Sequence, residues 1–300
     1  MFVVSFLFVS CSFQFPAFFM TSRLRAYLDL VRPLNLLITF LSVCAASVIA
    51  GAGPDDSFAV LAAGLSAALI AAGANAVNDF YDVDIDRVNR PDRPIPRGDL
   101  SPKNAWHSWV VLTISGFGLS LLIGSGLCVA ISLGAAVLLY VYSSTWKSTP
   151  LTGNIVVSIM TGMAFMYGAT AVGEPLRGAM PALFAFLSNM AREVVKDIED
   201  REGDAMHKAQ TFPVRYGVRP AQLVASVALV LLILATFAPY FAGVYTTTYL
   251  AVVLAADGML AFTAVMVLRQ DAPASMHRLS GVLKASMVVG LAAMYFGSRP

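Results

Sequence analysis

The chain has 300 residues, of which 58% are hydrophobic and only 13% are charged. A soluble domain has an apolar share nearer half and a charged share nearer a quarter, so this composition predicts an integral membrane protein. The net charge of +2 is too small to indicate a nucleic-acid partner.

The N-terminal segment 1–19 is apolar and rich in Phe, and no basic region precedes it. It has three interpretations: a short membrane segment, a poor signal-like stretch, or an extension produced by an upstream start codon wrongly chosen. We favour the last. The remaining residues 20–300 are expected to form one transmembrane domain.

Nine apolar stretches follow, each near the ~20 residues that a helix needs to cross a bilayer. The sequence therefore predicts an all-α, polytopic membrane protein. The nine ranges are 34–52, 57–80, 105–125, 127–143, 151–173, 179–196, 220–241, 246–268 and 281–297.

The distribution of basic residues predicts the orientation. With the N-terminus inside, only Arg177 and Arg299 of the 20 Lys and Arg residues fall on the outer side, as the positive-inside rule requires. We expect a multi-pass protein of the cell membrane.

A first acidic row lies at the cytoplasmic end of the second predicted helix. Asn78, Asp82 and Asp86 recur at i, i+4 and i+8, so their oxygens would lie along one helical face. Such a row repels itself unless it binds a cation. Mg²⁺ is suited to it, because this ion takes one or two carboxylates together with phosphate oxygens and water.

A second acidic row lies at the cytoplasmic end of the sixth predicted helix, where Asp197, Asp200 and Asp204 stand at i, i+3 and i+7. Two rows facing each other would hold a magnesium-bound diphosphate. The plainer interpretation is a solvated acidic loop with surface ion pairs, which are worth little and do not require helical spacing.

The segment Asn78-Asp79-x-x-Asp82-x-x-x-Asp86 resembles the first signature of the UbiA superfamily of intramembrane prenyltransferases, and residues 197–204 resemble its second acidic motif. The resemblance implies a helical bundle around a central cavity that binds Mg²⁺ and the diphosphate of a polyprenyl donor at the cytoplasmic face. The metal ligands it implies are Asn78, Asp79, Asp82, Asp86, Asp197, Asp200 and Asp204.

Residues 89–98 and 192–204 are similar to the digeranylgeranylglyceryl-phosphate synthase branch of that superfamily. This implies Mg²⁺-dependent transfer of a geranylgeranyl-type chain to the hydroxyl of geranylgeranylglyceryl phosphate, a membrane-embedded acceptor. Two alternatives stay open. One is an aromatic prenyltransferase of quinone or chlorophyll pathways. The other is a cation-coupled transporter, which would place charges nearer the bilayer midplane.

Cations near the two motifs complete the candidate site. Lys147 resembles one member of a family Tyr/Lys pair and is expected to act with Asp82 and Asp200 in catalysis by stabilising the leaving diphosphate, although a snorkelling lysine is the alternative. Arg32 and Asn35 are similar to a family entry motif, or else anchor the chain at the interface.

The acceptor phosphate would need further positive charge. Arg93 and Arg97 are spaced by four, and together with Arg192 and Lys196 they supply more cations than one diphosphate needs. Lys196 is alternatively expected to orient the second motif. The competing explanation is that these residues only follow the positive-inside rule. No residue stands out as a base for the acceptor hydroxyl.

Overall fold

The computed structural model describes residues 22–147, 149–206 and 209–298, and every regular element in these ranges is helical. The predicted N-terminal extension 1–19 lies outside the described residues. The long helices are α2 (Pro33–Ile49), α3 (Ser57–Tyr81), α5 (Pro102–Leu122), α6 (Gly126–Val141), α7 (Thr152–Ala171), α8 (Pro175–Met206), α10 (Val218–Phe241), α11 (Thr247–Arg269) and α12 (Pro273–Gly297). The short elements are α1 (Ser22–Val31), η2 (Pro54–Asp56), α4 (Val83–Asn89), the π-helical turn η3 (Tyr142–Trp146) and α9 (Phe212–Tyr216).

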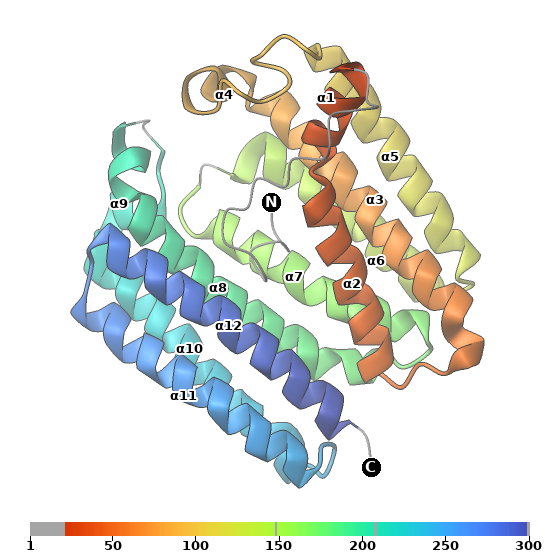
Figure 1. The fold of residues 1–300 in the computed structure, drawn as a ribbon, viewed down its shortest axis with the longest axis vertical. Helices are drawn as coiled ribbons and strands as arrows, with labels where there is room; N and C mark the ends of the chain where they lie inside the picture. The colour runs from red at the N-terminus through yellow and green to blue at the C-terminus, as the bar shows by residue number, and fades with distance from the viewer. Residues whose placement is uncertain (1–21, 148, 207–208, 299–300) are drawn as a thin grey trace.

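The helices form two groups that meet along α7 and α8 (Figure 1). In the first group α3 packs against α2 and α5, and α7 packs against α2. In the second group α8 packs against α10 and α12, and α11 packs between α10 and α12.

Small residues allow the helices to approach closely, as is common in membrane bundles. A Cβ atom at Gly168 of α7 would lie 2.3 Å from the carbonyl oxygen of Val43 in α2. A Cβ atom at Gly162 would lie 2.7 Å from the carbonyl oxygen of Ala182 in α8. These glycines therefore set the distance between α7 and its two neighbours.

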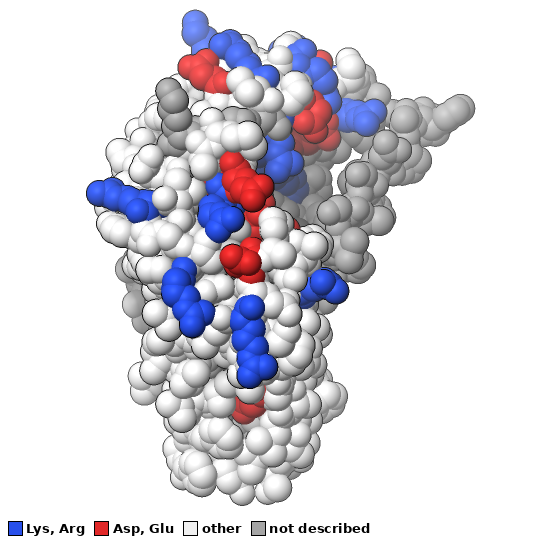
Figure 2. Space-filling view, turned by 90° about the vertical axis from the view of Figure 1, so that its left-hand side faces the viewer, with Lys and Arg blue, Asp and Glu red and all other residues white. Residues whose placement is uncertain are grey.

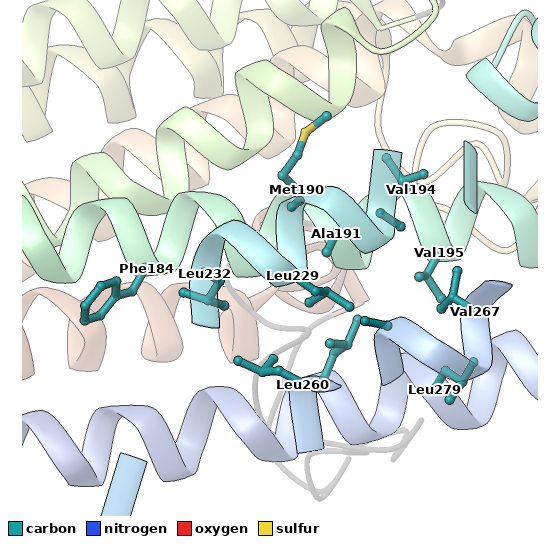
Figure 3. Close-up of a cluster of buried hydrophobic side chains, with 14 of the residues drawn as sticks. Phe184, Met190, Ala191, Val194, Val195, Leu229, Leu232, Leu260, Val267 and Leu279 are labelled. Carbon is teal, nitrogen blue, oxygen red and sulfur yellow. The ribbon is translucent and has the colours of Figure 1, made fainter. Parts of the chain in front are cut away.

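The largest buried apolar cluster fills the second group (Figure 3). Ala191 and Val195 of α8, Leu229 of α10 and Leu260 of α11 are among its members, whereas Met190 points to the other side of α8, toward Ser158 of α7. This packing holds α8 in place, and α8 carries the second acidic row.

The predicted count of nine membrane spans is not confirmed. Seven helices of the described chain are long and apolar enough to cross a membrane, or eight if the pair Ser22–Val31 and Pro33–Ile49, bent by 45°, is one span. The predicted span 179–196 lies within α8, which is not among them. Because α8 packs against α7, α10 and α12, it need not be apolar on every face.

On the face shown in Figure 2, charged side chains gather toward the end that carries α4 and α9 in Figure 1 and become sparse toward the other end. Together with the apolar helices, this polarity fits a multi-pass membrane protein with one strongly charged face.

The spacing of the first acidic row predicted one unbroken helix, and this prediction is wrong. α3 ends at Tyr81, Asp82 has φ −89° and ψ 3°, and α4 restarts at Val83. The backbone N–H of Asp82 still donates to Asn78 (3.0 Å), and that of Asp86 donates to Asp82 (2.8 Å), so the spacing of one turn is kept. The second row does lie on one helix, α8.

Candidate active site

A cavity of about 390 Å³ lies between α2, α3, α4, α6, α7 and α8. Its wall changes character along α3, where it passes from Ala67 and Ile70 to Asn78, and on to Asp82 at the helix end. The polar and charged part of the wall includes Arg32, Asn35, Asn75, Asn78, Asp82, Asp86, Arg90, Arg93, Lys147, Glu193, Lys196 and Asp197. The apolar part includes Ala67, Ile70, Ala71, Ala74, Ile131, Ala135, Leu139, Met160, Met163 and Ala164. The volume is in the range of small-molecule sites, and the cavity has one charged end and one apolar end.

Asp82 is bound by two side chains at the charged end. Asn78 donates to its Oδ2 atom at 2.9 Å, and Lys147 forms an ion pair with the same oxygen. Only 7% of the Asp82 side chain is exposed. Lys147 reaches this position because α6 ends in the π-helical turn η3, in which the Lys147 N–H donates to the carbonyl of Tyr142 at 3.0 Å. Single π-helical turns occur often at functional sites.

Arg93 connects Asp79 and Asp86. Its guanidinium donates to Asp79 at 3.2 Å and forms an ion pair with Asp86. Asp79 is only 3% exposed and is not on the cavity wall. Its second partner is Arg32, in the break between α1 and α2. Asp79 is therefore held between two arginines inside the protein.

Arg32 adopts φ +59°, a left-handed conformation that is uncommon for residues with a side chain. Asn75 stabilises this region, because its Oδ1 atom accepts from Arg32 at 3.2 Å and its Nδ2 atom donates to the carbonyl of Val31 at 2.8 Å. The backbone break aims the Arg32 side chain at α3 and the cavity.

Asp197 comes from the opposite wall, on α8. It accepts a hydrogen bond from Nδ2 of Asn154 in α7 at 2.8 Å. Burial raises the pKa of Asp197 to about 7. Glu193 lines the cavity one turn before it, so the second half of the site also presents two carboxyl groups.

The structure brings most of the predicted residues to the cavity wall, namely Arg32, Asn35, Asn78, Asp82, Asp86, Arg93, Lys147, Lys196 and Asp197. Five others are not among the lining residues, and one of them, Arg192, is buried within the protein. Asp79 is enclosed by arginines, Asp200 is exposed, and Asp204 accepts from Thr211 at 3.0 Å. Arg97 binds Asp99 at 2.5 Å and Asp29 at 3.2 Å.

Three residues of the site were not predicted. Glu193 and Arg90 line the cavity, and Asn154 positions Asp197. The spacing of four between Glu193 and Asp197 places both on one face of α8, which was a usable signal. Nothing in the sequence around Asn154 marks it, because its partner lies on another helix.

Residues 37–288 match the model of the UbiA prenyltransferase family. The digeranylgeranylglyceryl phosphate synthase of Methanopyrus kandleri is 40% identical over 270 residues, which cover 90% of this chain and 98% of that protein. The synthase of the same name from Thermococcus kodakarensis is 36% identical over 275 residues, with 91% and 98% covered.

Solved structures agree with this similarity. One, described as "Structural and mechanistic insights into the biosynthesis of Digeranylgeranylglyceryl phosphate synthase in membranes", has a TM-score of 0.85 at 27% identity and covers 93% of this chain and 99% of that one. A UbiA homolog from Archaeoglobus fulgidus bound to DMAPP and Mg²⁺ has the same fold, with a TM-score of 0.60 at 20% identity and coverage of 90% and 99%. Since the family model spans most of the chain and these relatives are matched over nearly their whole length, this chain belongs to the UbiA prenyltransferase family and is a prenyltransferase.

Proposed function

We propose that this protein transfers a geranylgeranyl-type chain from its diphosphate to the hydroxyl of geranylgeranylglyceryl phosphate and forms an ether lipid. The observation that carries the proposal is the cavity with one charged and one apolar end. A prenyl diphosphate has the same two-part character, because its head is anionic and its tail is a hydrocarbon. The names of the similar synthases support this choice of donor and acceptor.

The carboxylates on the cavity wall fit Mg²⁺ as an ion shared with the diphosphate. In the described part of the chain, no three His, Cys, Asp or Glu side chains stand close enough to form a metal site by themselves. Mg²⁺ is commonly held by one or two carboxylates plus substrate phosphates. Asp82 and Asp86 on one side and Asp197 on the other supply such oxygens. The Archaeoglobus fulgidus homolog bound to DMAPP and Mg²⁺ supports the same cofactor here.

Asp79, Asp200 and Asp204 stay predicted ligands. Asp200 lies three residues after Asp197 and therefore on the same face of α8, which supports its place among them.

The reaction begins when the C1–O bond of the donor breaks and its electron pair goes to the diphosphate. Bound Mg²⁺ would neutralise the charge that develops on this leaving group. Lys147 is already beside Asp82 and supplies an ammonium donor to the diphosphate oxygens. Preorganised donors of this kind lower the barrier because they need no reorganisation during the reaction.

The acceptor oxygen then forms a bond with C1 of the allylic cation and loses its proton to a diphosphate or carboxylate oxygen. Because an alcohol that attacks a cation loses its proton late, no strong base is needed. The apolar wall formed by residues such as Ile131, Met160 and Met163 holds the chain and excludes water, which would otherwise capture the cation.

The deciding experiment is an assay of the purified full chain with labelled geranylgeranyl diphosphate and Mg²⁺ against a panel of acceptors. We expect product with geranylgeranylglyceryl phosphate and none with 4-hydroxybenzoate or a chlorophyllide. Prenylation of an aromatic acceptor without reaction of the glyceryl phosphate would refute the proposed acceptor and favour a quinone- or chlorophyll-type enzyme. The charged cavity end is proposed to lie at the cytoplasmic face, as the distribution of Lys and Arg predicts.

A further inference from the structure

Three cations meet where α8 packs against α12. Arg192 and Glu199 are seven residues apart on α8, and His277 and Lys284 are seven apart on α12, so each pair is separated by about two helical turns. Glu199 lies near the end of α8 and contacts His277, near the start of α12, at 2.8 Å. The helices thus run antiparallel, so Arg192 and Lys284 stand at the same level of the α8–α12 pair, within electrostatic reach of each other.

Lys196 is the third cation, one turn after Arg192 on α8 and also within electrostatic reach of Lys284. Two carboxylates, Glu193 and Glu199, lie near the same lysine. Lys196 also interacts electrostatically with Asp197 and Asp200 of the second acidic row, and Glu199 also contacts His277.

Several donor groups of these cations lack a direct hydrogen-bond or ion-pair partner among the described residues. Arg192 is 3% exposed, its NH1 atom donates to Glu193 at 2.6 Å, and its Nε atom has no hydrogen-bond partner among the described residues. Lys196 and Lys284 make no ion pair or hydrogen bond with any residue that the structure describes. Burying charge without a partner is costly. Lys284 lies roughly 10 Å along α12 from His277, inside a candidate membrane span, where ionisable residues usually serve function.

The cluster reaches the reaction cavity through two of its α8 residues, whereas Arg192 and Lys284 lie behind the cavity wall. Glu193, which binds Arg192, lines the cavity wall, and so does Lys196, directly before Asp197. Arg93 and Arg97, which the sequence predicted to bind the acceptor phosphate, already have carboxylate partners. Arg93 pairs with Asp79 and Asp86, and Arg97 pairs with Asp29 and Asp99.

We propose that Arg192, Lys196 and Lys284 bind the phosphate of the acceptor, a phosphate monoester carried by a membrane amphiphile. This inference rests on the proposed function and assigns a separate place to the second anion. The donor diphosphate lies toward Lys147 and the acceptor phosphate toward α12. A phosphate dianion accepts several charge-assisted hydrogen bonds at once, and a guanidinium matches its geometry. It would supply a partner for the Arg192 Nε atom and for both lysines.

The test compares Lys284→Met and Lys196→Met with wild type in the purified full chain. Met keeps most of the apolar stem and removes the charge, and neither lysine is fully buried. Initial rates are measured with geranylgeranylglyceryl phosphate varied at saturating donor and Mg²⁺, and then with donor varied at saturating acceptor. The dephosphorylated acceptor, geranylgeranylglycerol, is measured beside it. Arg278→Met, an exposed residue of α12 that does not line the cavity, is the matched control.

Each lysine variant is expected to raise the KM for the phosphorylated acceptor roughly tenfold or more, as expected for one lost charged hydrogen bond, with the donor KM within twofold of wild type. Lys284→Arg should recover most of the loss. The rate with geranylgeranylglycerol should be low in wild type and unchanged in the variants.

Equal losses for both acceptors, or a rise in donor KM as large as that for the acceptor, would overturn the phosphate site while leaving the proposed reaction intact. Failure of wild type to prenylate the glyceryl phosphate at all would overturn the proposed function, and this inference with it. An unchanged acceptor KM in both variants would also reject the site, since wild-type turnover shows that the reaction itself is correct.

Discussion

Replacement of Lys147 by Ala tests whether this residue binds the leaving diphosphate. In the structure its ammonium group pairs with Asp82, and 40% of its side chain is exposed, against 7% for Asp82. A hydrogen bond to a charged group contributes about 1.5–3 kcal/mol. At 1.36 kcal/mol for each factor of ten, Lys147→Ala should lower kcat/KM for the donor by roughly 10- to 150-fold. Solvent screening of the partly exposed side chain favours the lower end of that range.

The assay is the initial rate of the purified variant with labelled geranylgeranyl diphosphate varied at saturating acceptor and Mg²⁺. Lys103→Ala is the control, because Lys103 is an exposed lysine at the start of α5 that does not line the cavity. A value of kcat/KM within twofold of wild type for Lys147→Ala would refute the reasoning. Lys147 would then be a lysine whose stem covers apolar surface while its charge reaches water.

Three further predictions concern the metal, the arginine network and the packing of α7. Asp82→Asn, Asp197→Asn and treatment of wild type with EDTA should each abolish transfer, since each removes part of the Mg²⁺–diphosphate site. Added Mg²⁺ should restore only the EDTA-treated wild type. Turnover near the normal rate in any of the three would contradict this prediction. Arg93→Met should destabilise the protein by about 3 kcal/mol, because it leaves the buried carboxylate of Asp86 without its cation while Asp79 keeps Arg32, and thermal unfolding in detergent measures this. An unchanged Tm with a raised acceptor KM would instead support the phosphate-binding role predicted from the sequence. Gly168→Ala should cost about 1–3 kcal/mol by overpacking, because its Cβ would lie 2.3 Å from a backbone oxygen, whereas Gly258→Ala, with nothing within 4 Å of the new atom, is the control that should keep the wild-type Tm.

The acidic residues of the site could be found from the sequence because their pattern is local. Asp82 and Asp86 are one turn apart, and so are the acids of the second row, and both sets follow long apolar segments. Residues three or four positions apart on a helix share a face whatever the rest of the chain does. The membrane class and the helical segments follow from composition and length in the same way.

The partners of these residues were decided only by the tertiary structure, because they come from distant parts of the chain. Asp79 belongs to the same sequence motif as Asp82, yet Arg32 and Arg93 enclose it inside the protein and away from the cavity. The sequence pattern also did not predict the break between α3 and α4 at Asp82. Helical spacing gives the direction of a side chain about its own helix. It does not tell which cation of another helix that side chain will meet.

The cationic cluster shows the same division. Arg192 and Lys196 share a face of α8 by their spacing alone, but Lys284 follows Arg192 by 92 positions and joins them only because α8 and α12 pack antiparallel. From the sequence alone, Arg93 and Arg97 were as good candidates for binding the acceptor phosphate as Arg192 and Lys196. The structure separates them because an arginine that already has carboxylate partners, such as Arg93 or Arg97, has less positive charge to offer a ligand than a lysine that makes no ion pair. The sequence determined which charges are present, and helix packing determined which of them are left without a partner.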